Sequence, residues 1–145
     1  MNTNQHHADP DCIFCKIIAG QIPCHKIHED DHTLAFLDIG PISRGHILII
    51  PKHHAATLAE LPAEAAAACG AVMPKLAAAV QQATECPASN VLQNNGQLSG
   101  QAVFHVHFHI IPRYENGSGL NFQWPAGSLS DNDAAELKQT IISYL

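Results

Sequence analysis

The feature that most constrains this chain is the stretch Phe104 to Arg113, FHVHFHIIPR, in which histidines alternate with large apolar residues. Strict alternation is the period of a β-strand, so His105, His107 and His109 are predicted to project from one face while the apolar side chains fill a core on the other. Neighbouring histidines on that face would lie about 6.5–7 Å apart. Because Pro112 cannot donate to a sheet ladder, the strand is predicted to end near it.

Three histidines on one face indicate chemistry rather than solubility. A half-exposed polar residue on an amphipathic strand explains any one of them, and Ser, Thr or Lys would serve solubility equally well. Imidazole adds metal ligation, proton transfer near neutral pH and nucleophilic attack. We therefore interpret this stretch as part of a functional site.

Composition limits the class of protein. The 145 residues predict one domain, and 46% hydrophobic residues are typical of a globular core. A formal net charge of -6 argues against a nucleic-acid polymer as partner, whereas a mononucleotide needs only a local cluster of donors. No run approaches the roughly 18–20 apolar residues of a membrane span. The first residues lack the basic and apolar regions of a signal peptide, so we expect a cytoplasmic protein without a membrane partner.

Residues 1–10 are polar and are predicted to form a flexible N-terminal tail, with a single domain over residues 11–145. His6 and His7 in the tail can bind metal, but a disordered tail is the preferred interpretation. No internal repeat and no linker divides the rest of the chain.

Cys12 and Cys15 form a C-x-x-C pair inside a short helix predicted over 12–19, which Asp11 caps and Gly20 closes. The chain has five cysteines, an odd number that argues against a disulfide framework in the cytosol. Redox activity, metal binding and chance can each explain a lone C-x-x-C, and we favour metal binding. That hypothesis requires two further ligands, for which histidines are the natural choice.

The remaining pattern predicts an α+β fold, an antiparallel sheet of about five strands with helices packed on one face. An alanine-rich helix is predicted over 62–85, with a kink or a break at Gly70 and Pro74. A last helix is predicted over 131–143. Besides the histidine strand, strands are predicted over 26–29, 33–37, 46–51 and 90–93.

Two further segments are candidates for a site. His54 follows the strand over 46–51, where ligands can be presented, although a surface histidine explains it equally well. In the loop over 94–101, Gly96 and Gly100 allow backbone conformations that aim N–H groups at one point, as in anion-binding loops. A plain hairpin loop is the alternative. The position just upstream of three imidazoles favours a phosphate cradle.

At this point the residues resemble the histidine triad (HIT) family. His105-Val-His107-Phe-His109-Ile-Ile is similar to the family signature H-φ-H-φ-H-φ-φ, in which φ is apolar. The resemblance covers roughly residues 11–127 in collinear order and points to the bacterial Hint-type branch. It is also carried by the segments CIFCKIIAG (12–20), IP (22–23), LAFLD (34–38), GH (45–46), IPK (50–52), NNG (94–96), GQ (100–101) and WP (124–125).

The resemblance implies a homodimer with a HIT-like fold that hydrolyses purine nucleoside phosphoramidates, acyl-nucleotides or dinucleoside polyphosphates at the α-phosphorus. It implies that His107 is a catalytic nucleophile that forms a nucleotidyl-histidine, and that His109 and His46 hold phosphate oxygens or protons. Asp38 matches the carboxylate that accepts the ribose hydroxyls. The phosphate loop is matched by Asn94, Gly100 and Gln101, and the purine slot by Ile13, Phe14, Ile22, Phe36 and Ile39. In zinc-bearing members, the four ligands of a structural zinc are matched by Cys12, Cys15, His54 and His105.

Two other functions remain open alternatives. In a zinc-dependent hydrolase the histidines would bind a catalytic metal, but a zinc held by two cysteines and two histidines has no open position. The other alternative is a purine-nucleotide-binding regulator with little turnover. It is kept open by Ala102, which stands where many family members have a Ser or Thr whose hydroxyl can serve the leaving group. Strand alternation from His107 predicts that position 102 lies off the imidazole face. A hydroxyl at 102 could reach the site only if the strand starts later, because the pleat does not fix the backbone direction in a loop.

Overall fold

The computed structural model describes residues 6–145. The predicted tail over 1–10 therefore lies partly outside the described residues. Its described part contacts the domain, since His6 Nε2 lies 2.8 Å from the Asp31 carbonyl oxygen and the His54 N–H donates to the His7 carbonyl at 2.7 Å.

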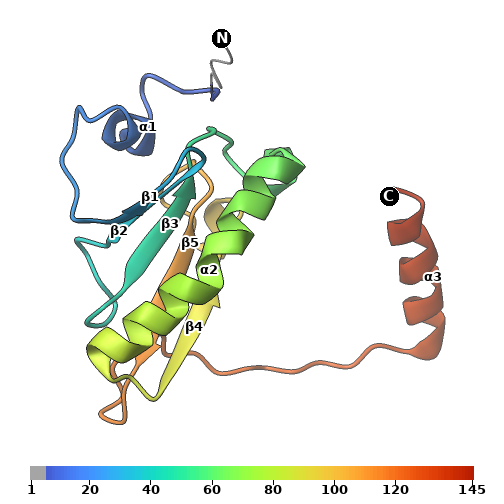
Figure 1. The fold of residues 1–145 in the computed structure, drawn as a ribbon. Helices are drawn as coiled ribbons and strands as arrows, with labels where there is room; N and C mark the ends of the chain where they lie inside the picture. The colour runs from blue at the N-terminus through green and yellow to red at the C-terminus, as the bar shows by residue number, and fades with distance from the viewer. Residues whose placement is uncertain (1–5) are drawn as a thin grey trace.

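Five antiparallel strands form one sheet in the order β1-β2-β3-β5-β4 (Figure 1). This arrangement confirms the predicted α+β fold. It places the histidine-bearing strand β5 between β3 and β4, with His109 opposite Leu48 of β3 and Leu92 of β4. The strands are β1 (Lys26–Glu29), β2 (Thr33–Leu37), β3 (Ile47–Pro51), β4 (Ala88–Leu92) and β5 (Phe108–Arg113).

Helix α2 (Ala63–Thr84) covers one face of the sheet (Figure 1). It buries Cys69, Val72, Leu76 and Val80 against Ala35, Ile47, Ile49 and Ile110. Each large aliphatic side chain buried in this way contributes about 1.5–3 kcal/mol of transfer free energy. The break predicted at Gly70 and Pro74 is absent, and α2 runs on as one helix. Both residues lie on its exposed face, where water can bond the Gly70 carbonyl that Pro74 leaves without a donor.

By length and composition alone, α2 is long and apolar enough to cross a membrane. No apolar segment of that length was expected from the sequence. The buried side chains of α2 pack on the sheet, while Glu64 and Lys75 lie on its exposed side. In this fold α2 therefore acts as a core helix.

The short helix α1 (Ile13–Ile18) lies at the opposite face of the sheet, so the helices do not all share one face as predicted. Phe14 enters a second core cluster there, with Leu34, Phe36, Leu48 and Ile50. The sheet is thus buried on both sides at β2 and β3, and the residues that flank Phe14 lie near the histidines at the start of β5.

The strand predicted from Phe104 begins only at Phe108, and residues 101–107 are irregular. The Val106 N–H donates to the Ala55 carbonyl at 2.8 Å, outside the sheet. His105 and His107 therefore lie in an approach loop, whereas His109 lies in β5. The approach loop gives His105 surroundings different from those of the other two imidazoles.

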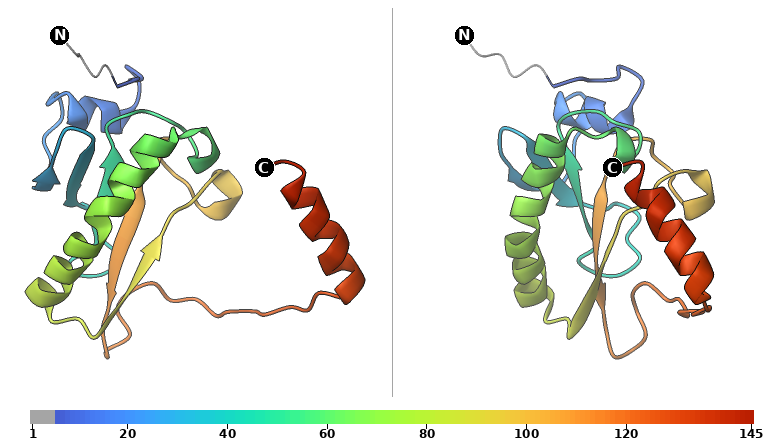
Figure 2. Two further views of the ribbon diagram at one scale, coloured as in Figure 1. Left: turned by 45° about the vertical axis from the view of Figure 1, so that its right-hand side comes forward. Right: turned by 90° about the vertical axis from the view of Figure 1, so that its right-hand side faces the viewer.

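Residues 114–130 carry the chain away from the sheet to helix α3 (Asp131–Ile142), which stands apart from the domain in Figure 1 and in the left view of Figure 2. Ser130 Oγ caps this helix by accepting the Asp133 N–H at 3.2 Å. No residue of α3 is buried, although Leu137 and Ile141 are apolar. We call residues 114–145 the C-terminal arm.

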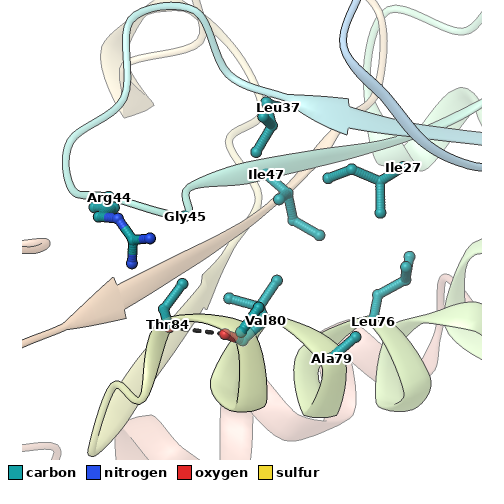
Figure 3. Close-up of a pocket in the computed structure, with 10 residues that line it drawn as sticks. Ile27, Leu37, Arg44, Gly45, Ile47, Leu76, Ala79, Val80 and Thr84 are labelled. Atoms are coloured by element: carbon teal, nitrogen blue, oxygen red, sulfur yellow. Dashed lines mark hydrogen bonds between the residues drawn. The ribbon is translucent and has the colours of Figure 1, made fainter.

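A groove of about 400 Å³ separates α2 from the edge of the sheet at β1 and β2 (Figure 3). Ile27, Leu37 and Leu76 line it, and Arg44 lies at one end. None of the predicted site residues lines this groove.

Candidate functional site

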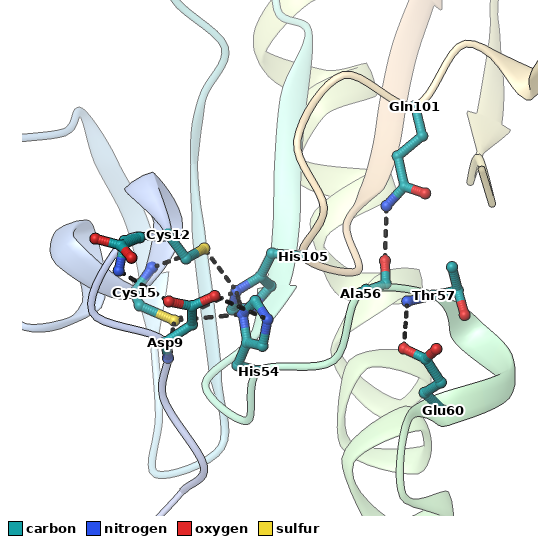
Figure 4. A network of polar contacts seen from close by, with 10 residues as sticks. Asp9, Cys12, Cys15, His54, Ala56, Thr57, Glu60, Gln101 and His105 are labelled. Atoms are coloured by element: carbon teal, nitrogen blue, oxygen red, sulfur yellow. Dashed lines mark hydrogen bonds and ion pairs between the residues drawn. The ribbon is translucent and has the colours of Figure 1, made fainter. Parts of the chain in front are cut away.

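Four predicted metal ligands meet between α1, the segment after β3 and the approach loop. One ligand atom from each of Cys12, Cys15, His54 and His105 lies within 4.8 Å of the other three (Figure 4). His105 Nδ1 is 3.4 Å from Cys12 Sγ, 3.7 Å from Cys15 Sγ and 3.2 Å from His54 Nδ1. Cys15 Sγ is 3.6 Å from His54 Nδ1.

These spacings match the edges of a zinc tetrahedron. With Zn–S near 2.3 Å and Zn–N near 2.05 Å, tetrahedral angles place sulfur and nitrogen ligands about 3.5 Å apart and two nitrogens about 3.3 Å apart. Two cysteines with two histidines are also a closed donor set for a structural zinc. The residues present therefore fit a four-coordinate zinc.

The hydrogen bond and the burial of His105 leave its ring in the form that a metal ligand requires. Its Nε2–H donates to the Pro51 carbonyl at 2.8 Å, so the lone pair is on Nδ1, which faces the cluster. Burial lowers the pKa of His105 to about 4, which keeps the ring neutral at pH 7. Burial also raises the pKa of the Cys15 thiol to about 11, a cost that a metal cation would offset by binding the thiolate.

On the other side of α1 lies a cavity of about 330 Å³. It collects Asp38, His107 and His109 together with all five residues predicted for a purine slot, Ile13, Phe14, Ile22, Phe36 and Ile39. Its wall is almost wholly apolar, with the carboxylate and the two imidazoles at one end. This arrangement suits a flat apolar ring system that carries a polar, reactive group.

His107 has a fixed orientation. Its Nδ1–H donates to the main-chain carbonyl of His105 at 2.7 Å, and Phe14 packs edge-on against its ring with centroids 5.2 Å apart. The lone pair is therefore on Nε2, for which residues 6–145 offer no hydrogen-bond partner. An imidazole whose Nε2 has no partner at a cavity wall can act as a nucleophile.

His46 and His109 form a directed chain of hydrogen bonds. The Ile42 N–H donates to His46 Nδ1 at 3.1 Å, so His46 carries its proton on Nε2 and donates it to His109 Nδ1 at 2.8 Å. His109 must then carry a proton on its own Nε2. Burial lowers the pKa of His109 to about 4 and also lowers that of His46, so both rings are neutral at pH 7.

The ligand atoms of Asp38, His46 and His109 also lie within 4.8 Å of one another. The hydrogen bonds argue against a second metal there, because the proton on His46 Nε2 occupies the space between the two rings. Asp38 Oδ1 accepts the Gly40 N–H at 2.8 Å and its Oδ2 lies 3.5 Å from His46 Nε2. The carboxylate keeps further lone pairs for a ligand.

Gly45 brings His46 to this position. Its φ is +89°, and a Cβ there would come within 2.5 Å of Thr84 Cγ2, so the chain needs glycine to pass α2 before it enters β3.

The three residues predicted for a phosphate loop, Asn94, Gly100 and Gln101, do not line the cavity. The Gln101 side chain donates to the Ala56 carbonyl at 2.7 Å and accepts the Gly96 N–H at 2.7 Å, so its role here is to hold the loop in place (Figure 4). Gly100 takes a positive φ of 94°, and Asn94 Nδ2 lies beside it.

Sequence reasoning missed several residues of the cavity wall. Ile17, Pro23, Cys24, Leu37, Leu48 and Val103 all line it. Most lie in loops or at element ends, where no periodic pattern marks them. Ala102 also lines the cavity, contrary to the alternation argument, because β5 begins after the approach loop and the pleat does not fix the direction of position 102.

Comparison with known proteins agrees with this geometry. The model of the HIT domain family matches residues 19–116. The adenosine 5'-monophosphoramidase hnt1 of Schizosaccharomyces pombe is 47% identical over 134 residues, which are 92% of this chain and 98% of the relative.

Two solved structures show the same fold. A HIT family protein from Bacillus anthracis superimposes with a TM-score of 0.90 at 40% identity, covering 94% of this chain and 98% of the other. A zinc-bound histidine triad family protein from Mycobacterium smegmatis gives a TM-score of 0.71 at 32% identity, covering 93% and 98%. With the triad on one approach loop and strand, a matching family model and these relatives, the chain belongs to the HIT domain family.

Proposed function

We propose that this protein hydrolyses purine nucleoside phosphoramidates or related nucleotides at the α-phosphorus through a nucleotidyl-histidine. The observation that carries the proposal is the geometry of His107, whose Nδ1–H is held by the His105 carbonyl while its Nε2 is free on the cavity wall. The name of the S. pombe relative, an adenosine 5'-monophosphoramidase, supports the substrate class.

In the first step, the His107 Nε2 lone pair forms a bond to the α-phosphorus, and the bond from phosphorus to the leaving group breaks. The electron pair goes to the leaving atom, which takes a proton from solvent at the open side of the cavity when it is an amine. The nucleotidyl-imidazolium is stabilised because its Nδ1–H donates to the His105 carbonyl. Water then attacks phosphorus, loses a proton and releases the nucleoside monophosphate with free His107.

His109 supports both steps from beside the nucleophile, with ring centroids 4.9 Å apart. Its Nε2–H donates to a phosphoryl oxygen, where negative charge must be stabilised in the transition state. The proton stays on Nε2 because His46 supplies the proton on the other side of the ring. Phe14, Phe36 and the isoleucines of the slot pack against the base.

We further propose that Cys12, Cys15, His54 and His105 hold a structural zinc. The match of their spacings to a tetrahedron supports this, as does the likeness to a zinc-bound relative. The zinc would stabilise the fold, and the closed donor set disfavours a zinc-dependent hydrolase.

A homodimer is proposed as well. Strand β4 is an edge of the sheet, and the C-terminal arm projects away from its own domain with an apolar side that residues 6–145 leave uncovered. A second copy offers both the edge and the arm a partner.

The proposed function is tested by measuring kcat/KM of the purified protein on adenosine phosphoramidate and on diadenosine tetraphosphate. We expect turnover of at least one, with AMP as a product. Tight nucleotide binding without turnover of either substrate would instead favour the regulator, and activity that needs added metal would favour the metallohydrolase.

The carboxylate of Asp38 is expected to select ribonucleotides. It lies at the end of β2 on the cavity wall, where its remaining lone pairs can accept hydrogen bonds from the 2′ and 3′ hydroxyls. A 2′-deoxy substrate leaves an acceptor unpaired, which costs about 1–3 kcal/mol. The kcat/KM of the ribo substrate should therefore exceed that of the deoxy substrate by about tenfold or more. Asp38→Asn should shrink this ratio, and equal values in the wild type would refute the assignment.

Ala102→Ser is expected to raise activity on phosphoramidates relative to dinucleoside polyphosphates. A departing amine needs a proton, whereas a departing nucleotide phosphate is stable as an anion. Position 102 lines the cavity, so a serine hydroxyl can reach the leaving group. General acid assistance is worth about 10²–10⁴-fold, and a lone hydroxyl should fall at or below the low end. The measurement is the ratio of the two kcat/KM values in each protein. An unchanged ratio would mean that water or His109 already supplies the proton.

A further inference from the structure

The four residues from Cys12 to Cys15 belong to two sites at once. The two cysteines point their sulfurs into the ligand cluster with His54 and His105. Between them, Ile13 and Phe14 line the cavity. One turn of chain therefore joins the metal cluster to one wall of the slot.

Apart from the two cysteines, this wall is held by apolar packing of Phe14, Ile17 and Ile18 on the sheet. Helix α1 has six residues, and a helix of that length is not stable on its own. Phe14 is buried in the core, but Ile13 is 47% exposed and Ile22 lies in the loop that follows. Through their sulfurs, Cys12 and Cys15 connect α1 to His54 and His105 on the other side of the cluster.

The position of His107 depends less on the metal cluster than the position of α1 does. The His105 ring donates to Pro51, and its carbonyl fixes His107. The adjoining Val106 N–H donates to Ala55. None of these hydrogen bonds involves a cysteine sulfur, so we expect His107 to keep its orientation when the cluster holds no metal.

We propose that the metal at this cluster clamps α1 as a wall of the nucleotide slot, so that metal occupancy sets nucleotide affinity more than it sets the chemical step. Cys12 and Cys15 are in this sense positioning residues for the slot. The inference rests on the proposed function, because it requires that the cavity bind a nucleotide.

The test compares AMP binding by calorimetry with and without zinc. Protein with about one zinc per chain is measured first, then protein stripped by a chelator, then the stripped protein reloaded. We expect stripping to weaken AMP binding by about tenfold or more and reloading to restore it. On the substrate, KM should rise in proportion while kcat changes by less than about threefold.

Hydrogen exchange supplies a readout that does not depend on nucleotide. Stripping should remove protection from the amides over 13–19 while those of β3 and β5 keep theirs. Cys12→Ser should reproduce the effect, and Cys86→Ala, which removes a buried thiol outside the cluster, should not. Unchanged AMP affinity in verified metal-free protein, or unchanged protection over 13–19, would overturn the clamp.

A second measurement covers the case in which stripped protein unfolds. Linkage requires that AMP tighten zinc binding by the same factor by which zinc tightens AMP binding. Competition with a chelator, with and without saturating AMP, reads this factor on folded protein, and equal zinc affinities would overturn the proposal. If the zinc-loaded protein does not bind AMP at all, the proposed function itself fails. If it binds AMP equally with and without zinc, only the clamp fails.

Discussion

His107→Ala is expected to abolish turnover while nucleotide binding stays within a few-fold of the wild type. The substitution removes the ring whose Nε2 faces the cavity, but it leaves the apolar wall and the Asp38 carboxylate unchanged. Loss of a covalent nucleophile typically lowers kcat by on the order of 10⁴–10⁶-fold. Steady-state kinetics and AMP calorimetry on the same preparation measure the two quantities.

The covalent intermediate can be detected directly. Denaturing mass spectrometry after a brief reaction should show a nucleotidyl adduct on His107 in the wild type and none in His107→Ala. His25→Ala is a matched control, because His25 is an exposed histidine whose side chain does not line the cavity. Full activity in His107→Ala would refute the covalent mechanism and would favour a metal-dependent hydrolase.

Removal of the zinc is expected to lower the stability of the folded protein by a large amount. A ligand at 1,000 times its dissociation constant stabilises the folded state by about 4 kcal/mol. For a domain of this size that corresponds to a fall in Tm of about 8–16 °C. Calorimetry of untagged protein, with metal analysis alongside, should show this fall on chelation and in the double variant Cys12→Ser, Cys15→Ser.

At saturating substrate, the folded fraction of that double variant should keep most of its activity, since neither sulfur lines the cavity. Cys86→Ala shows what loss of a buried thiol does by itself. The zinc assignment fails if the protein purified at neutral pH contains no metal, or if chelation leaves Tm unchanged.

Local sequence patterns predicted the elements whose partners are near in sequence. Strands β1 and β2 have the predicted bounds, because they are neighbours in the sequence and form a hairpin around Asp30. The family resemblance, and not a local pattern, indicated the five slot residues that meet at one cavity.

Contacts between distant segments were not predictable in this way. The alternating pattern begins at Phe104, but β5 starts only at Phe108, because the Val106 N–H donates to the Ala55 carbonyl outside the sheet. Because the strand starts later, Ala102 lines the cavity, the outcome that strand alternation alone did not predict. The side-chain amide of Gln101 donates to the Ala56 carbonyl. This hydrogen bond depends on the position of a loop about 45 residues away in the sequence.

The bond from Ile42 to His46 has a consequence for mutational tolerance. The atom that orients both His46 and His109 is a main-chain N–H, and the side chain of Ile42 is about half exposed. Residues of very different size and polarity should therefore be accepted at position 42. Proline is the exception, because it has no N–H, and without that donor His46 is free to take the other tautomer. In a saturation scan, position 42 should look like ordinary surface for every substitution except this one.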